Sequence, residues 1–157
     1  VGHFHYVLGM AMTFAAFSGV YYWFPKVTGR MYAEALGKFS FWLMVIGSNV
    51  LYFAQMVVGI MGMPRRYVDY PPIEAWAKLN TIETVGAFIL MAGILITLIA
   101  WARGLRGPQA GRNPWGSPSL EWTTASPPPP QNFDSFPVDV AADWTPYRYD
   151  NHSVSSQ

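Results

Sequence analysis

The sequence predicts an all-α membrane protein with three transmembrane helices and an extended, proline-rich tail. Three stretches, residues 1–25, 39–64 and 84–102, contain no Asp, Glu, Lys or Arg. Each is long enough for a membrane helix, which needs roughly 17–25 residues. Hydrophobic residues make up 52% of the chain and charged residues only 12%, about half of their usual share in soluble domains.

The first predicted helix covers residues 1–25. Its aromatic cluster at Tyr21, Tyr22 and Trp23 is typical of a membrane–water interface, and a short cytoplasmic loop is expected over residues 26–38. Its small residues would let it pack closely on other membrane helices; they are Gly9, Ala11, Ala15, Ala16, Ser18 and Gly19.

The second predicted helix covers residues 39–63 and ends before Pro64. Asn49 and Gln55 interrupt its apolar sequence, and amides at membrane depth usually form hydrogen bonds with a neighbouring helix. An outer loop with the sequence Pro-Arg-Arg-Tyr is expected over residues 64–78.

The third predicted helix covers residues 79–102, with Glu83 near its start and no role for that carboxyl evident from the sequence. An extended tail over residues 103–157 follows. Its run of four prolines, 127–130, favours polyproline II. The last fifteen or so residues are expected to be disordered.

Positive charge predicts the orientation. Lys and Arg are more frequent in cytoplasmic loops. One side holds Arg65, Arg66 and Lys78, and the other holds twice as many cations: Lys26, Arg30, Lys38, Arg103, Arg106 and Arg112. The loop 26–38 and the tail 103–157 are therefore expected in the cytoplasm, and the start of the chain at the outer face.

Composition excludes several kinds of site. There is no cysteine, so disulfides and thiolate metal sites are excluded, and the net charge of +1 does not suggest a nucleic-acid partner. The chain begins with Val1 directly in an apolar run, without the basic start of a signal peptide. We expect it to be a piece of a longer polypeptide.

Two histidines, His3 and His5, stand at the start of the first helix. In an α-helix this spacing places them about 200° apart, on opposite faces. They cannot both ligate one metal from one face, which needs a spacing of four, but they can serve two cofactors with Phe4 between them. The alternative is that each imidazole bonds to a neighbouring helix or to water.

Arg65 and Arg66 lie on the side with fewer cations. Each side chain could simply extend its guanidinium group to the membrane–water interface, as arginines near helix ends often do. Guanidinium groups also bind carboxylates through two parallel hydrogen bonds. A haem ligated by His3 or His5 with its propionates toward the outer face would bring those carboxylates to the arginines, so the two motifs support each other.

Four segments of the chain resemble one family: GHFHYVL, YYWFPKVTGRMY, GMPRRYVDYP and NPWGSPSLEWTTASPPPP. They are similar to the C-terminal third of subunit I of haem–copper terminal oxidases, in particular aa3-type cytochrome c oxidases. The resemblance covers about residues 1–136. It implies that the three spans are the last three of a twelve-helix bundle, in a bacterial inner (plasma) membrane rather than the mitochondrial inner membrane.

The resemblance also implies roles for individual residues. His3 would be the proximal ligand of the high-spin haem at the oxygen site, and therefore catalytic, and His5 an axial ligand of the low-spin haem. Phe4 would lie between the two haems, and Arg65 and Arg66 would contact their propionates. The cofactors would be haem a and haem a3, with copper in the complete subunit but no copper ligand in this chain.

The activity implied is that of a proton-pumping cytochrome c oxidase. Electrons from cytochrome c would pass through a dicopper centre in another subunit to the low-spin haem and then to the haem–copper site, where O₂ becomes water. The partners would be the rest of subunit I, the other oxidase subunits and the lipid membrane. The isolated chain of 157 residues is expected to be inactive.

Two other classes remain open: a quinol oxidase or another haem–copper relative such as a nitric oxide reductase, and a membrane subunit that only packs on partners. The sequence also departs from the family. Gly9 replaces a common Ser, and Met56 replaces the His of a frequent Pro-Gln-His, while Gln55 is kept. These changes indicate a divergent bacterial member.

Overall fold

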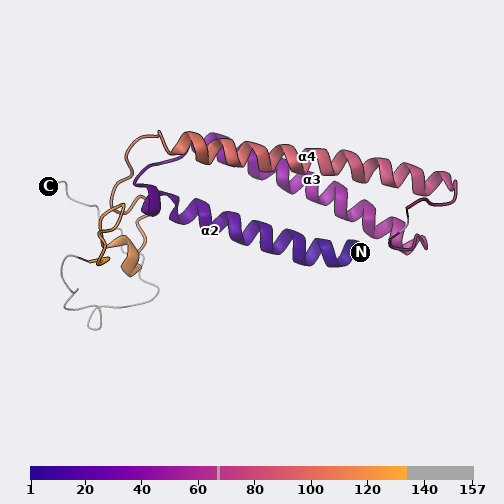
Figure 1. Cartoon of the computed structure of the whole chain (residues 1–157), viewed down its shortest axis with the longest axis horizontal. Coiled ribbons are helices and arrows are strands. Elements are labelled where there is room, and N and C mark those ends of the chain that lie inside the picture. The colour runs from indigo at the N-terminus through magenta and orange to yellow at the C-terminus, as the bar shows by residue number, and fades with distance from the viewer. Residues whose placement is uncertain (67, 134–157) are drawn as a thin grey trace.

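The computed structural model describes residues 1–66 and 68–133. Three long helices, of 27, 27 and 31 residues, reverse direction at each connection, and the tail lies at one end of them (Figure 1). All three are long and apolar enough to cross a membrane, which confirms the predicted fold class. The elements are α1 (Gly2–Phe4), η1 (His5–Met10), α2 (Ala11–Thr28), α3 (Glu34–Ile60), α4 (Glu74–Gly104) and the single 3₁₀ turn η2 (Leu120–Trp122).

The helices extend beyond the charge-free stretches that predict them. α3 begins at Glu34 and α4 at Glu74, both inside segments expected as loops. In each first turn an acid pairs with a lysine four residues later: Glu34 with Lys38 at 2.8 Å and Glu74 with Lys78 at 2.6 Å. Such pairs stabilise helix surfaces in water, so charge here marks the end of the apolar region rather than the end of the helix.

α1, η1 and α2 form one continuous helix from Gly2 to Thr28. It runs through Pro25, whose missing N–H costs a hydrogen bond only in the last turn. Gly29 ends the helix in the left-handed conformation, with φ of 68°, and its N–H donates to the Pro25 carbonyl at 2.9 Å. A glycine adopts this C-terminal cap without steric cost.

α3 and α4 are the closest-packed pair. Gly47 of α3 faces the backbone of Leu90, and Gly86 of α4 faces the backbone of Leu51, where an added Cβ would lie 2.5 Å from the amide nitrogen. Small residues bring membrane helices close together in this way. Most of the buried residues of the pair are therefore glycine, alanine, serine or threonine, and the larger buried side chains are Met44, Val58 and Trp76.

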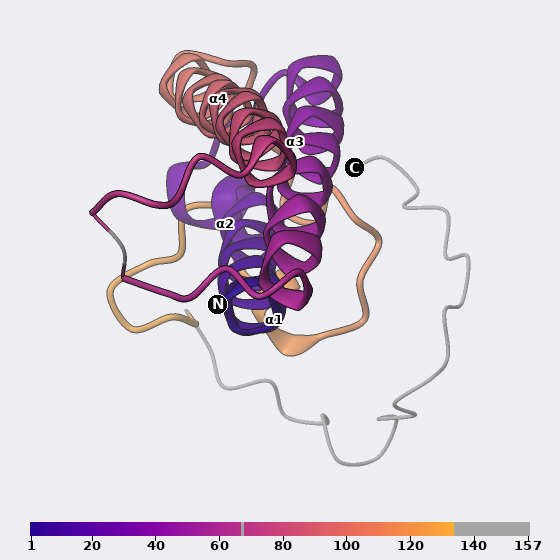
Figure 2. The same ribbon diagram turned by 90° about the vertical axis from the view of Figure 1, so that its right-hand side faces the viewer.

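The first long helix lies to one side of the α3–α4 pair (Figure 2). Its α1 and η1 segments contact α3. Farther along, aromatic side chains occupy the space between the helices: Phe17 and Tyr21 of α2 meet Trp101 of α4 edge-on, with ring centroids 5.2 and 5.4 Å apart. The first helix thus contacts the α3–α4 pair near its start, where the backbones lie close together, and near its end through aromatic side chains.

The first part of the tail packs on the end of α2. Lys26 Nζ donates to the carbonyls of Arg112, Thr124 and Ala125 at 3.2, 2.8 and 3.2 Å. Trp122 is 1% exposed, and its indole N–H donates to the Tyr22 hydroxyl at 2.8 Å. The expected disorder of the last residues lies outside the described part of the chain.

Candidate functional site

The predicted site begins where the first helix changes its winding. α1 is followed at His5 by η1, a π-helical segment that continues to Met10. Short π-helical segments within α-helices are rare and frequently occur at functional sites. The sequence gives no sign of this change, because the spacing of apolar residues hardly differs between the two kinds of turn.

One ring nitrogen of His5 is hydrogen-bonded, and the other has no partner among residues 1–66 and 68–133. Its Nδ1 atom lies 3.0 Å from the Val1 carbonyl oxygen. An oxygen of this kind can only accept, so Nδ1 carries the proton in this contact and Nε2 keeps its lone pair. A backbone carbonyl orients many metal-binding imidazoles in the same way. The His5 ring stacks on Tyr52 of α3, with centroids 6.2 Å apart, and Phe4 meets it edge-on at 5.3 Å.

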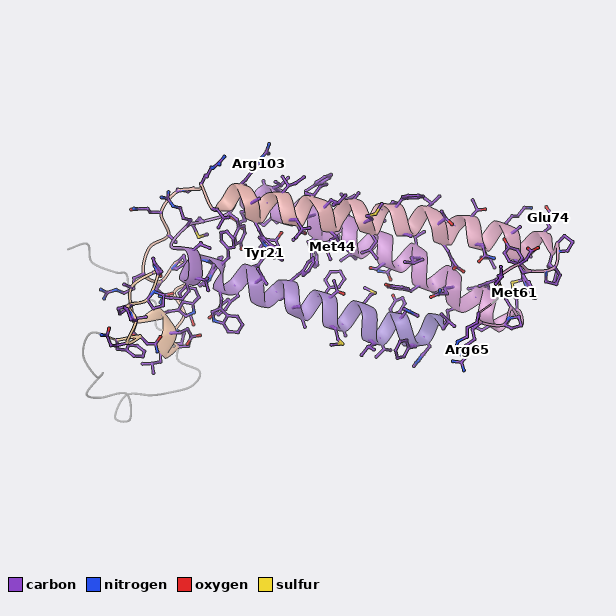
Figure 3. The ribbon with its side chains drawn as sticks, in the orientation of Figure 1. Tyr21, Met44, Met61, Arg65, Glu74 and Arg103 are labelled. Carbon is purple, nitrogen blue, oxygen red and sulfur yellow. The ribbon has the colours of Figure 1, made fainter. Side chains whose placement is uncertain are left out.

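His3 has different neighbours. It is exposed and lines a groove of about 520 Å³ at the end of the molecule where the helix α3 passes into the loop to α4. Arg65 and Arg66 line the same groove, and Figure 3 shows Arg65 at this end of the bundle. The structure therefore brings His3 and the arginine pair together, as the sequence motifs suggest. His5 and Phe4 are not among the groove's lining residues.

The wall of this groove carries polar groups from two helices. Gln55 of α3 and Glu83 of α4 both line it, and the Oε1 atom of each is buried without a hydrogen-bond partner among the described residues. Asn80 also lines it and donates to the Trp76 carbonyl at 2.8 Å. Met56, at the position of the family's frequent His, is a further lining residue.

Sequence reasoning misses the aromatic support of His5. Tyr52 stacks on His5, and the Tyr6 hydroxyl donates to Asn49 Oδ1 of α3. Asn49 thus bonds to another helix, as its place in an apolar segment predicts. Gly9 explains how Tyr52 fits, since an added Cβ would lie 3.3 Å from the Tyr52 hydroxyl. The sequence contains many aromatic residues, so nothing in it distinguishes the tyrosine that contacts His5 from the others.

The side chains of this site suit a cofactor that already contains a metal ion. Across residues 1–66 and 68–133, no three His, Asp or Glu side chains lie close enough together to hold a metal ion. A groove that His3 shares with the guanidinium groups of Arg65 and Arg66 instead matches a metal-carrying ring with acidic substituents.

Comparison with known proteins gives the family. Residues 1–89, more than half of the chain, match the family described as cytochrome c and quinol oxidase polypeptide I. The chain belongs to this family. The matched segment includes the histidine pair, the arginine pair and Glu83, so all the groups described above belong to the family region.

Individual relatives of this oxidase family are similar over most of the chain. A probable cytochrome c oxidase subunit 1-beta of Nocardia farcinica is 43% identical, with 87% of this chain and 24% of the relative covered. Cytochrome c oxidase subunit 1 of Synechocystis is 46% identical, with 88% and 25% covered. A haem–copper oxidase subunit I+III of Aeropyrum pernix is 45% identical, with 88% and 17% covered. The chain spans a quarter or less of the length of these oxidase subunits.

Proposed function

We propose that this chain is the C-terminal part of the catalytic subunit of a membrane-bound terminal oxidase. In this proposal the complete enzyme takes electrons from cytochrome c, reduces O₂ to water and pumps protons. The observation that carries the proposal is the groove shared by His3, Arg65 and Arg66. Two residues after His3 stands a second imidazole, His5, whose Nδ1 atom contacts the Val1 carbonyl. Family membership supports the same reading.

Two haems would be held by this chain together with the rest of the subunit. Bound haem supplies electron transfer and, beside copper, oxygen reduction. His3 would ligate the high-spin haem and His5 the low-spin haem, with the Val1 carbonyl fixing the His5 tautomer. Phe4, edge-on to His5, would separate the two sites.

Arg65 and Arg66 would bind the haem propionates. A guanidinium group offers five N–H donors in a planar fork that matches a carboxylate. Both side chains are exposed at the groove, so propionates can reach them without displacing a protein partner. The same contacts would offset the negative charge of the propionates and so raise the potential of the haem iron.

The test is the optical spectrum of the complete oxidase. We expect His3→Ala to remove the bands of the high-spin haem and His5→Ala those of the low-spin haem. His152→Ala, the same change at the third histidine, serves as the control and should keep both sets of bands. Retention of both haems in the His3 and His5 variants would refute the proposal and favour a subunit that only packs on partners.

The electron donor is a separate question, because the family name covers both cytochrome c and quinol oxidases. The relatives named above as cytochrome c oxidases support cytochrome c. The partners proposed are the rest of subunit I, a dicopper subunit and the lipid bilayer of a bacterial inner membrane. By itself the chain would lack the copper ligands and the second ligand of the low-spin haem, and it is expected not to reduce oxygen.

A further inference from the structure

Glu83 is an acidic side chain near the start of the third span, directly before the charge-free stretch 84–102, and none of the roles above uses it. It lies on α4, nine residues after the first residue of that helix, Glu74. At about 1.5 Å per residue, this is roughly 13 Å from the start of a helix roughly 46 Å long. Since a hydrocarbon core is about 30 Å thick, Glu83 lies just inside its outer boundary if α4 is centred. An ionisable side chain at this depth usually has a function.

Glu83 and the arginine pair line the same groove. The ion pairs of the described residues are Glu34–Lys38 and Glu74–Lys78, so Glu83 belongs to neither. Its Oε1 atom is buried without a partner in the described part of the chain, and so is Oε1 of Gln55 across the groove. Leaving a buried acceptor without a donor costs about 1–3 kcal/mol.

The groove therefore contains hydrogen-bond acceptors and guanidinium donors that do not bond to each other in the described structure. Two acceptors, on α3 and α4, lack donors, and two guanidinium groups from the connecting loop are exposed beside them. The other polar side chains among the lining residues are the imidazole of His3 and the amide of Asn80, and the backbone amino group of Val1 also lines this space. Glu83 is the one carboxyl group among the groove's lining residues, and the opposite charges attract more strongly once the groove is closed to water.

We propose that Glu83 is the counter-charge of the arginine groove: a carboxylate that faces Arg65 and Arg66, offsets part of their positive charge and so sets the redox potential of the haem whose propionates they bind. The proposal rests on the proposed function. In the same proposal Gln55 offers a second acceptor to the guanidinium groups. A negative charge near haem iron favours the oxidised form, so removing it favours the reduced form.

The experiment is a spectroelectrochemical titration of both haems in the complete oxidase carrying Glu83→Gln. We expect the midpoint potential of one haem to shift to a more positive value, with haem content and band positions unchanged. Glu74→Gln is the matched control, since it makes the same change on the same helix where the carboxylate is exposed and paired with Lys78. That variant should keep both midpoint potentials.

Two further variants keep the test decisive. Glu83→Asp retains the charge and should keep the potential closer to that of the unmodified enzyme. Glu83→Ser removes the charge with a smaller side chain and should give the same positive shift if Glu83→Gln does not assemble. Unchanged potentials in charge-removing variants that contain both haems would overturn this inference alone. Haem retention in His3→Ala and His5→Ala would instead overturn the proposed function.

Discussion

Lys26 is a buried cation at the end of α2, only 5% exposed. From the sequence it is one of several loop charges on the cytoplasmic side. In the structure its ammonium group donates to three tail carbonyls and lies 4.9 Å from the centre of the Trp122 ring. An ammonium has three N–H donors, so these carbonyls satisfy it completely. One residue thus fixes the tail to the first helix.

Replacing Lys26 with Met should release the tail. Hydrogen bonds to charged groups contribute about 1.5–3 kcal/mol each. Counting the contribution of only one of the three bonds, we expect the free energy of tail opening to fall by at least about 2 kcal/mol, or roughly thirty-fold in the opening equilibrium. Trypsin cleavage after Arg112 in the membrane-bound oxidase should accelerate correspondingly. Lys38→Met is the control, because Lys38 forms an exposed ion pair of small energetic value. Equal cleavage rates in both variants would contradict the role of Lys26.

At the scale of elements, the α3–α4 pair depends on close backbone approach. Gly86 meets the backbone of Leu51, and Gly93 meets the backbone and side chain of Met44. Backbone cannot move aside as a flexible side chain can, so any added carbon must push the helices apart. The buried hydroxyls of Ser48 and Thr97 donate to carbonyls of their own helices, which satisfies them without widening the contact.

We expect Gly86→Ala to destabilise the oxidase by about 1–3 kcal/mol, the usual cost of an overpacked core. The new Cβ would lie 2.5 Å from the Leu51 nitrogen. The measurement is the thermal unfolding midpoint of the purified enzyme in detergent. Gly59→Ala is the comparison, because its added Cβ meets no atom within 4 Å from the described residues beyond its own helical neighbours, and alanine favours a helix. A midpoint as high in Gly86→Ala as in Gly59→Ala would rule out the close contact.

At the scale of the whole molecule, the three helices leave large apolar surfaces exposed. Large apolar side chains such as Met12, Phe53 and Phe88 are each more than half exposed. In a subunit about four times as long, these surfaces would meet other helices or lipid. The distribution of cations then predicts which end faces the cytoplasm.

Single-cysteine labelling can test that orientation, because the chain contains no cysteine. Lys78→Cys and Lys38→Cys place a thiol at opposite ends of the bundle, and both lysine side chains are 72% exposed. A membrane-impermeant maleimide added to intact cells should label the Lys78 variant and not the Lys38 variant. In permeabilised cells the maleimide should label both variants. Labelling of the Lys38 variant alone in intact cells would reverse the proposed topology.

Much of this architecture can be predicted from the sequence for a simple physical reason. Hydrocarbon excludes charge, so the three charge-free stretches identify the spans. The same rule cannot locate helix ends, since Glu34–Lys38 and Glu74–Lys78 continue their helices into water. The shared groove of His3 and the arginines follows from topology. The position of Glu83 in that groove depends on the rotation of α4, which the apolar sequence around it does not specify.

The attachment of Lys26 to the tail has a consequence for biosynthesis. Its buried acceptor, the Thr124 carbonyl, lies 98 residues later in the chain. At translation speeds of about 5–20 residues per second, the ribosome reaches that acceptor roughly 5–20 s after it has added the lysine. During this interval both later helices are made and the lysine must remain hydrated. The tail can close over it only after the last span has been synthesised, so this contact forms late in the maturation of the chain.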